Sequence, residues 1–282
     1  MVSDYTESLL EQIRMGHEIN GEKPHARDTP FRHSDAGKCA RYLGLKYMGI
    51  DKSDTPKSGS QFVMWLGTKL HNDWQKTRSP HLGEHAEYPV SDHNQLASGA
   101  LDLFVNRAKE AKVTVECKFP SGKKFARIIG ITDRGPHSKR KKPAGPDPGH
   151  VIQLALNTVG SDSERGLLFY WATSALSLFV QNSINKYYPD DQLSDEDLFI
   201  KEFWFTREQL NPIAAAELAR LEQIKSIVDD GGLPPAVAID EGFKPTEELD
   251  PVYDLETNFH CLYCDRRSAC LAVADTIPTI RR

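Results

Sequence analysis

Two charged residues stand two positions apart within an apolar, β-branched stretch of the sequence. The stretch VTVECKFPSG (113–122) contains an acid, Glu116, and a base, Lys118. Side chains alternate between the two faces of a β-strand, so both charges are expected on the same face of a sheet. A strand that packs a core does not normally point two charges inward. The stretch is therefore either a solvated strand or part of a site that does chemistry.

A second acid is expected beside Glu116. Asp102 lies in the preceding strand-like stretch, and the connection between the two stretches is centred on Lys109. A hairpin with that centre pairs Val105 with Val113 and therefore Asp102 with Glu116, with Cβ atoms about 4.5–5.5 Å apart. Two carboxylates at that separation repel each other unless a cation lies between them. Hard oxygen ligands suit Mg²⁺ or Mn²⁺.

A metal between these acids would place Lys118 where it could orient a water nucleophile or stabilise charge on a phosphate. The competing interpretation is a solvent-facing hairpin with a cross-strand salt bridge, because this short pattern is common by chance. Two further residues favour a site. His71 lies four residues after Gly67 on one helix face and offers a metal ligand. Gln153 is a polar amide among apolar residues, and it needs a partner such as a phosphate or the lysine.

The order of these residues along the chain is more specific than any one of them. It resembles the PD-(D/E)xK nuclease superfamily, in its RecB-like branch. The resemblance implies a metal site formed by His71, Asp102, Glu116 and the backbone carbonyl of Cys117. It also implies that Lys118 is the catalytic lysine and that Gln153 is the glutamine on the following helix. One position departs from the pattern, because the family commonly has a tyrosine four residues after the glutamine and this chain has Asn157 there.

The five cysteines include a spaced group near the end of the sequence. HCLYCDRRSAC places Cys261, Cys264 and Cys270 in a C-x2-C-x5-C pattern, and Cys39 lies far upstream. The odd number and the lack of a secretory signal favour a reducing cytoplasm, where clustered thiols bind metal more often than they form disulfides. A tetrathiolate site suits zinc or iron–sulfur. A zinc knuckle would use the C-terminal trio with either Cys39 or His260.

The cysteine spacing, with Cys39 ahead of the nuclease motifs, resembles the iron–sulfur RecB-type exonucleases. That group includes the CRISPR-adaptation nucleases and the AddB subunit of helicase–nucleases. The resemblance implies a 4Fe-4S cluster that joins the two ends of the domain, on the ligands Cys39, Cys261, Cys264 and Cys270. Loss of a cluster held by such distant ligands is expected to loosen the flanking segments. The remaining cysteine, Cys117, is expected to be a small apolar residue within its strand.

The charge distribution allows a local nucleic-acid surface. The formal net charge of -5 argues against a generally basic coat, but residues 123–142 contain eight Lys or Arg and one Asp. The predicted DNA contacts are Lys139, Arg140, Lys141, Lys142 and Arg41. The alternatives are a solvated loop for the basic run, and packing near the cysteines for Arg41.

The order of the predicted elements indicates an α/β protein with a mixed sheet wrapped by helices. The family resemblance implies that this is a restriction-endonuclease-like mixed central sheet flanked by helices. Residues 1–33 are expected to form an N-terminal helix and loop, and residues 34–282 the nuclease domain with its cysteine-ligated ends. Helices are predicted over 4–16, 36–50, 61–77, 148–160 and 207–230, and strands over 84–90, 98–105, 112–119, 166–173, 176–183 and 198–205. Residues 25–35 are predicted to be a polar loop and 120–149 a mobile loop. No apolar run is long enough to predict a membrane span.

These features together predict a cytoplasmic, Mg²⁺- or Mn²⁺-dependent exonuclease that acts on DNA ends or single strands. The resemblance implies a setting in recombination, repair, CRISPR adaptation or phage DNA metabolism, with recruitment to a recombination, repair or CRISPR-adaptation complex. Two other classes stay open. One is a non-catalytic DNA-binding module of the same fold, which would be expected to have lost the lysine or an acid. The other is a zinc-stabilised protein of unrelated function.

Overall fold

The structure, a computed structural model, describes residues 29–54, 58–108, 110–129, 145–173, 199–234 and 264–272. The chain divides into two compact units, each built from segments that are distant in sequence. The first unit comprises Met1–Trp65, Asn94–Ala97 and Ala215–Arg282, and the second comprises Leu66–His93 and Ser98–Ala214. The helix predicted over residues 4–16 lies outside the described residues. No helix within the described residues is long and apolar enough to cross a membrane.

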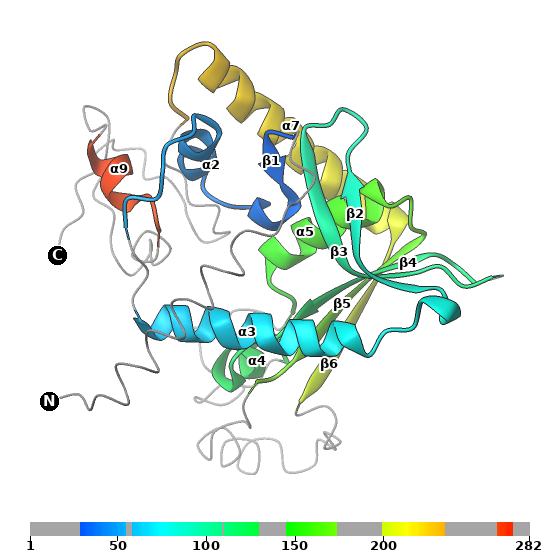
Figure 1. Cartoon of the computed structure of the whole chain (residues 1–282). Helices are drawn as coiled ribbons and strands as arrows, with labels where there is room; N and C mark the ends of the chain where they lie inside the picture. Colours follow the sequence, from blue (N-terminus) through cyan, green and yellow to red (C-terminus); the bar gives the residue numbers. More distant parts are fainter. Residues whose placement is uncertain are drawn as a thin grey trace, which may run out of the picture. The chain divides into compact units, whose positions relative to one another are not determined.

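The second unit is built on a mixed sheet (Figure 1). Its strands are β2 (Glu84–Ser91), β3 (Ala97–Val105), β4 (Val113–Lys118), β5 (Arg165–Trp171) and β6 (Ile200–Thr206), and the short helix η2 (Pro80–Leu82) precedes β2. β3 pairs antiparallel with β2 and β4, β4 runs parallel to β5, and β5 pairs antiparallel with β6. These five predicted strands are confirmed, whereas the strand predicted over 176–183 lies outside the described residues.

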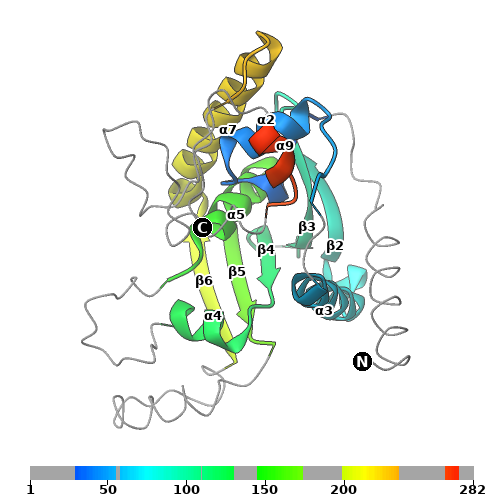
Figure 2. The ribbon, with the colours of Figure 1, turned by 90° about the vertical axis from the view of Figure 1, so that its left-hand side faces the viewer.

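The parallel pairing of β4 and β5 requires a crossover, and α5 (Pro148–Gly160) supplies a helix within it. Asp147 caps this helix by accepting a hydrogen bond from the Gly149 backbone N–H at 3.0 Å. The helix lies over β4 and β5 (Figure 2). The packing is tight at Gly166 of β5, where an added Cβ would lie only 2.8 Å from Leu210 Cδ1 and 2.9 Å from Thr158 Oγ1.

The opposite face of the sheet is covered by α3 (Ser58–Lys76), which contributes its residues from Leu66 onward to this unit. Trp74 of this helix packs against Leu103, Val115 and Leu167. These strand residues alternate with the positions that face α5, such as Glu116. The two charged residues of β4 therefore point toward α5.

Part of the predicted mobile loop is helical. Residues Gly122–Ile128 form α4, so the prediction of a loop throughout 120–149 is wrong at this point. The helix is stabilised by burial of Phe125, Ala126 and Ile128. Its lysines and the glycine at its start had favoured the prediction of a loop. Residues 130–144, which include the basic positions 139–142, lie outside the described residues.

The first unit contains β1 (Phe31–Arg32), η1 (His33–Asp35), α2 (Ala40–Tyr47), α9 (Arg267–Ala272) and the larger part of α7 (Arg207–Asp229). Its apolar core consists of Phe31, Leu43, Leu96, Ala97, Leu221 and Ile224. Within the range predicted as a polar loop, 25–35, Phe31–Arg32 forms β1 and His33–Asp35 forms η1. The Phe31 N–H donates to the Leu96 carbonyl at 3.1 Å, which ties this short strand to the start of β3.

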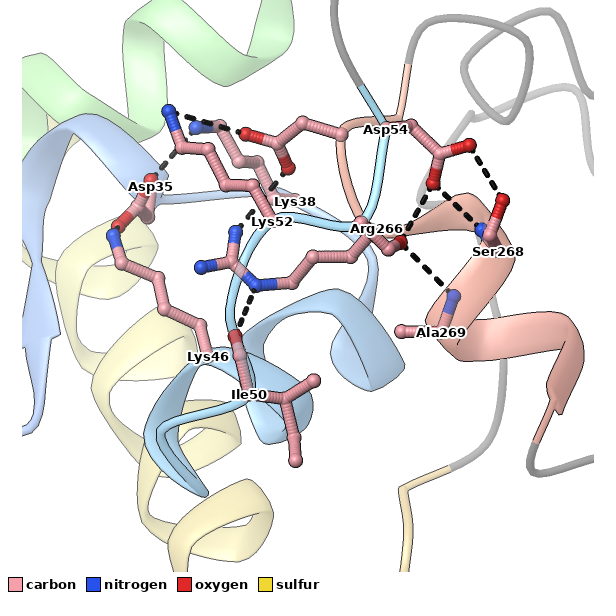
Figure 3. Close-up of polar contacts among 11 residues, drawn as sticks. Asp35, Lys38, Lys46, Ile50, Lys52, Asp54, Arg266, Ser268 and Ala269 are labelled. Carbon is pink, nitrogen blue, oxygen red and sulfur yellow. Dashed lines mark hydrogen bonds and ion pairs between the residues drawn. The ribbon is translucent and has the colours of Figure 1, made fainter.

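Hydrogen bonds link the segment after α2 to the start of α9 (Figure 3). Asp54 accepts from the Ser268 backbone N–H at 2.7 Å and from the Ser268 hydroxyl at 2.6 Å. Arg266 Nε donates to the Ile50 carbonyl at 3.0 Å. The Ser53 hydroxyl accepts from the Ala269 N–H at 3.0 Å. We call these contacts among residues 50–54 and 265–269 the α9 clamp.

Candidate active site

The predicted catalytic residues come together in the second unit. His71 of α3 lies with its Nε2 2.9 Å from Asp102 Oδ1 on β3. Lys118 Nζ of β4 lies 2.6 Å from Glu116 Oε1 and donates to Gln153 Oε1 of α5 at 3.0 Å. Four elements, α3, β3, β4 and α5, therefore place two acids, two bases and one amide in a single site.

The hairpin register explains how Asp102 enters this site. The predicted pairing of Val105 with Val113 is confirmed, and the ladder continues to Leu103 and Val115. One step further, Asp102 Oδ2 accepts the backbone N–H of Cys117 at 2.7 Å. A side-chain carboxylate thus takes a hydrogen bond from the β4 backbone, and this bond fixes it next to Glu116.

The pairing of β2 with β3 is also interrupted opposite Asp102. β2 pairs Ala86 with Leu103 and Tyr88 with Leu101, and the intervening Glu87 has a left-handed φ of 52°. A non-glycine residue in that conformation costs about 1–3 kcal/mol and is often found at functional sites. Asp102 therefore lies at a break in the regular pairing on both sides of its strand.

Gln75 connects this break to α3. Its Nε2 donates to Glu87 Oε1 at 2.9 Å and to the backbone carbonyl of Asp102 at 3.2 Å. Sequence reasoning missed both Gln75 and Glu87. The signal for Gln75 was its position four residues after His71 on the same helix face. Nothing in the sequence around Glu87 indicates its backbone conformation.

The two acids have opposite pKa shifts. Burial and the neighbouring charge of Asp102 raise the pKa of Glu116 to about 7, although Lys118 acts against this. Burial alone would raise the pKa of Asp102, but its hydrogen bond and ion pair with His71 lower it. Near neutral pH, the site therefore holds one firmly ionised carboxylate and one that titrates readily.

The pKa values of the two bases are both raised. Burial alone would lower the pKa of Lys118, but the charges of Glu116 and Asp102 raise it. Burial likewise opposes the charged form of His71, and the hydrogen bond and charge of Asp102 raise its pKa. Lys118 is thus a hydrogen-bond donor with a fixed positive charge.

Asn157 is a further member of the site that sequence reasoning treated only as a departure from a pattern. It is fully buried, and its Nδ2 donates to Glu116 Oε2 at 2.8 Å. It lies four residues after Gln153, so one face of α5 presents two amides to β4. One amide holds Lys118 and the other holds Glu116. That spacing was the available signal.

His150, one turn before Gln153, is a neutral neighbour of the site. Burial and the positive charge of Lys118 lower its pKa to about 3. Its Nδ1 lies 2.9 Å from the hydroxyl of Tyr170. Sequence reasoning missed His150 because its role depends on this tertiary neighbour.

The donor types fit a divalent cation, since His71, Asp102 and Glu116 offer one imidazole and two carboxylates. Glu116 Oε1 is buried and forms an ion pair with Lys118 without a well-directed hydrogen bond, which leaves its lone pairs incompletely used. In this structure the side chains of the site form ion pairs with one another. No group of three or more His, Cys, Asp or Glu among the described residues is arranged to hold a metal ion. The metal site therefore stays a prediction.

Three of the four predicted cluster cysteines lie in the described part of the first unit. Cys39 is at the N-cap position of α2, Cys264 precedes α9 and Cys270 lies within it. Burial raises the pKa of Cys264, and the nearby sulfurs of Cys39 and Cys270 contribute to the increase. The three thiols are free and near enough to influence one another, but the described residues do not arrange them as a metal site. Cys261 lies outside the described residues, so the four-ligand cluster also stays a prediction.

Arg41 is placed differently from the predicted DNA contact. It is only 4% exposed, and its Nε donates to the backbone carbonyl of Pro234 at 3.0 Å. Its side chain also lies close enough to Cys270 to lower the pKa of that thiol, which burial raises. This burial contradicts a direct contact with DNA and favours packing near the cysteines. Cys117 is buried in β4 as predicted.

Comparison with known proteins gives a similarity of fold. Neither a protein-family model nor a curated protein matches this sequence. The crystal structure of SSO0001 is similar over 96% of this chain and 97% of that chain, with a TM-score of 0.51 and 14% identity. An alkaline exonuclease from Laribacter hongkongensis, LHK-Exo, is similar over 68% of this chain and 82% of its own, with a TM-score of 0.37 and 16% identity. Its complex with dAMP covers 71% and 95%, with a TM-score of 0.33 and 15% identity. The first similarity supports a mixed α/β fold with a central sheet flanked by helices, and these identities carry no statement about activity.

Proposed function

We propose that this chain is a metal-dependent nuclease that hydrolyses phosphodiester bonds of DNA. The observation that carries the proposal is the convergence of His71, Asp102, Glu116, Lys118 and Gln153 at one site. A solvent-facing hairpin with a salt bridge would leave these groups in water. Glu116 is instead fully buried, and its pKa is raised. Such perturbed groups are typical of catalytic sites.

The chain's own residues would share the work as follows. His71, Asp102 and Glu116 would hold a Mg²⁺ or Mn²⁺ ion, which when bound lowers the pKa of a water molecule and neutralises phosphate charge. Lys118 keeps its proton, so its Nζ stabilises negative charge on the phosphate and does not accept a proton. Gln153 orients that ammonium group, and Asn157 orients the carboxylate of Glu116.

The finer proposal is an exonuclease acting on DNA ends or single strands, of the RecB-like iron–sulfur type. It is supported by the gathering of three thiols from the two ends of the described chain. We propose that Cys39, Cys261, Cys264 and Cys270 hold a 4Fe-4S cluster, with zinc as the alternative. Visible absorbance and iron analysis of anaerobically prepared protein would distinguish the two.

The competing function is a non-catalytic DNA-binding module of this fold. Such a module gains nothing from a buried, charge-strained acid pair. Each charged group of the pair here has its own partner, since Asn157 contacts Glu116 and His71 contacts Asp102. The arrangement therefore favours catalysis.

The decisive experiment is digestion of end-labelled DNA by purified protein with Mg²⁺, with Mn²⁺ and with a chelator. We expect cleavage with either metal, and a loss of at least about 100-fold in Glu116→Ala and Asp102→Ala. Glu110→Ala, which removes a 60% exposed glutamate near the same hairpin, is the matched control and should cleave normally. Absence of cleavage by the wild-type protein, or equal cleavage by all three variants, would overturn the proposal.

A further inference from the structure

A row of aromatic rings passes the candidate active site. Phe169 stacks on Trp74 with ring centroids 6.4 Å apart, and Trp74 stacks on His71 at 6.3 Å. Phe119 meets His71 edge to face, with centroids 6.3 Å apart, and its ring centroid lies 6.1 Å from that of Trp171. The row begins within the apolar core of the sheet and ends at Trp171, which is 43% exposed.

The exposed end of this row is continuous with the site. β4 and β5 run parallel, with Lys118 opposite Tyr170, so Phe119 and Trp171 are the next residues beyond the catalytic strand position. They alternate with Lys118 and Tyr170 and so lie on the sheet face that α3 covers, and His71 of α3 lies beside Phe119 and also contacts Asp102. The imidazole is therefore shared between the acid pair and the aromatic row.

An indole exposed at this place calls for a ligand with an apolar, flat face. Single aromatic residues at a surface are common, but Trp171 and Phe119 extend from a group that we propose to act on a phosphodiester. A phosphodiester substrate carries a base on each sugar, and an unpaired base can stack on an aromatic side chain regardless of sequence. A base within a duplex is already paired and stacked, so it cannot present its face in this way.

We propose that Phe119 and Trp171 form a stacking subsite for an unpaired nucleobase next to the scissile phosphate. The site would therefore take single-stranded DNA ends in preference to paired ends. This inference rests on the proposed nuclease function and adds a substrate preference to it. His71 couples the subsite to the chemistry, because its ring packs edge to face with Phe119 while its Nε2 contacts Asp102.

The test uses a fluorescently labelled oligothymidylate and full-length protein without divalent cations, so that cleavage does not interfere with binding. We expect Trp171→Ala to weaken binding by about 10-fold, which is within the range of one base–aromatic stack. The dependence of affinity on salt should stay unchanged, because no phosphate contact is lost. Trp171→Phe keeps a ring and should restore most of the affinity. Binding to a blunt duplex should change little in either variant.

Trp204→Ala is the matched control. Trp204 is 53% exposed on the neighbouring strand, but it pairs with Leu167, four residues and roughly 13 Å along the strand from Trp171. This control should bind like the wild-type protein. Equal binding by Trp171→Ala and wild-type protein, or an equal loss in Trp204→Ala, would overturn the subsite even if the wild-type protein cleaves DNA. Failure of the wild-type protein to cleave any DNA with Mg²⁺ or Mn²⁺ would instead overturn the proposed function itself.

Discussion

The acid–base site of the second unit and the cysteine region of the first are built in different ways. In the sheet, the charged side chains of the site contact one another directly. His71 forms an ion pair with Asp102, and Lys118 forms one with Glu116. In the cysteine region, the thiols lie beside a frame made by other residues, the α9 clamp. A substitution in the sheet site should therefore disturb its neighbours directly. Removal of a thiol should leave the hydrogen bonds of the α9 clamp intact.

The largest expected effect follows from removing the lysine of the sheet site. Lys118→Ala should lower turnover by about 100- to 1,000-fold while DNA binding persists, because a fixed positive charge contributes most in the transition state. Single-turnover cleavage and equilibrium binding measure the two quantities separately. Lys112→Ala, which changes a lysine just before β4, should leave both unchanged. A loss confined to DNA binding would make Lys118 a phosphate anchor only.

Removal of the second amide on α5 tests how far the site depends on its supports. Asn157→Ala leaves Glu116 Oε2 without its 2.8 Å donor and should raise the Mg²⁺ concentration needed for cleavage by about 10-fold. Titration of cleavage rate against Mg²⁺ measures this shift. Asn106→Ala, at an exposed position after β3, is the control. An unchanged Mg²⁺ requirement would show that Asn157 supports packing alone.

The raised pKa of Glu116 predicts a pH-dependent cost in stability. Folding raises this pKa from 4.5 to about 7. The stability linked to the proton is thus present below pH 4.5 and is lost as the pH rises through 7. As the pH rises from 4.5 to 8, the wild type should lose stability that Glu116→Gln keeps. The free energy of unfolding of the variant minus that of the wild type should therefore increase by up to about 3 kcal/mol. Denaturant titrations without divalent cations measure the difference. A difference that stays constant with pH would show that Glu116 is not strained.

The smallest effect separates the thiols from their frame. Cys264→Ser should remove bound metal but leave α9 docked through Asp54 and Ser268. Asp54→Ala should instead lower hydrogen-exchange protection of the Ser268 and Ala269 amides by about fivefold, with the cysteines intact. The sequence and its family resemblance predicted that cluster loss loosens the flanking segments. Equal loosening in both variants would restore that view and make the α9 clamp secondary.

The sequence was sufficient to predict those parts of the site that depend on the alternation of side chains along a strand and on the geometry of a hairpin. The centre of the β3–β4 connection predicted the register that brings Asp102 to Glu116, and the burial pattern around Gln153 predicted that it needs a partner. Glu87 could not be predicted, because nothing in its local sequence indicates a left-handed conformation. Asp54 could not either, since its partners lie 214 residues away and only the folded chain brings them within hydrogen-bonding distance.

The parallel pairing of β4 with β5 sets an order of events during folding. The β3–β4 hairpin closes a short loop, so Asp102 and Glu116 can meet early, whereas β5 can join only after the longer crossover that contains α5. Until that helix docks, the acid pair lacks Gln153 and Asn157. We therefore expect substitutions in the hairpin core, such as Val115→Ala, to slow folding, and substitutions at the α5–β5 contact, such as Leu154→Ala, to speed unfolding instead. The candidate active site would then be the last part of the sheet to acquire its charge balance.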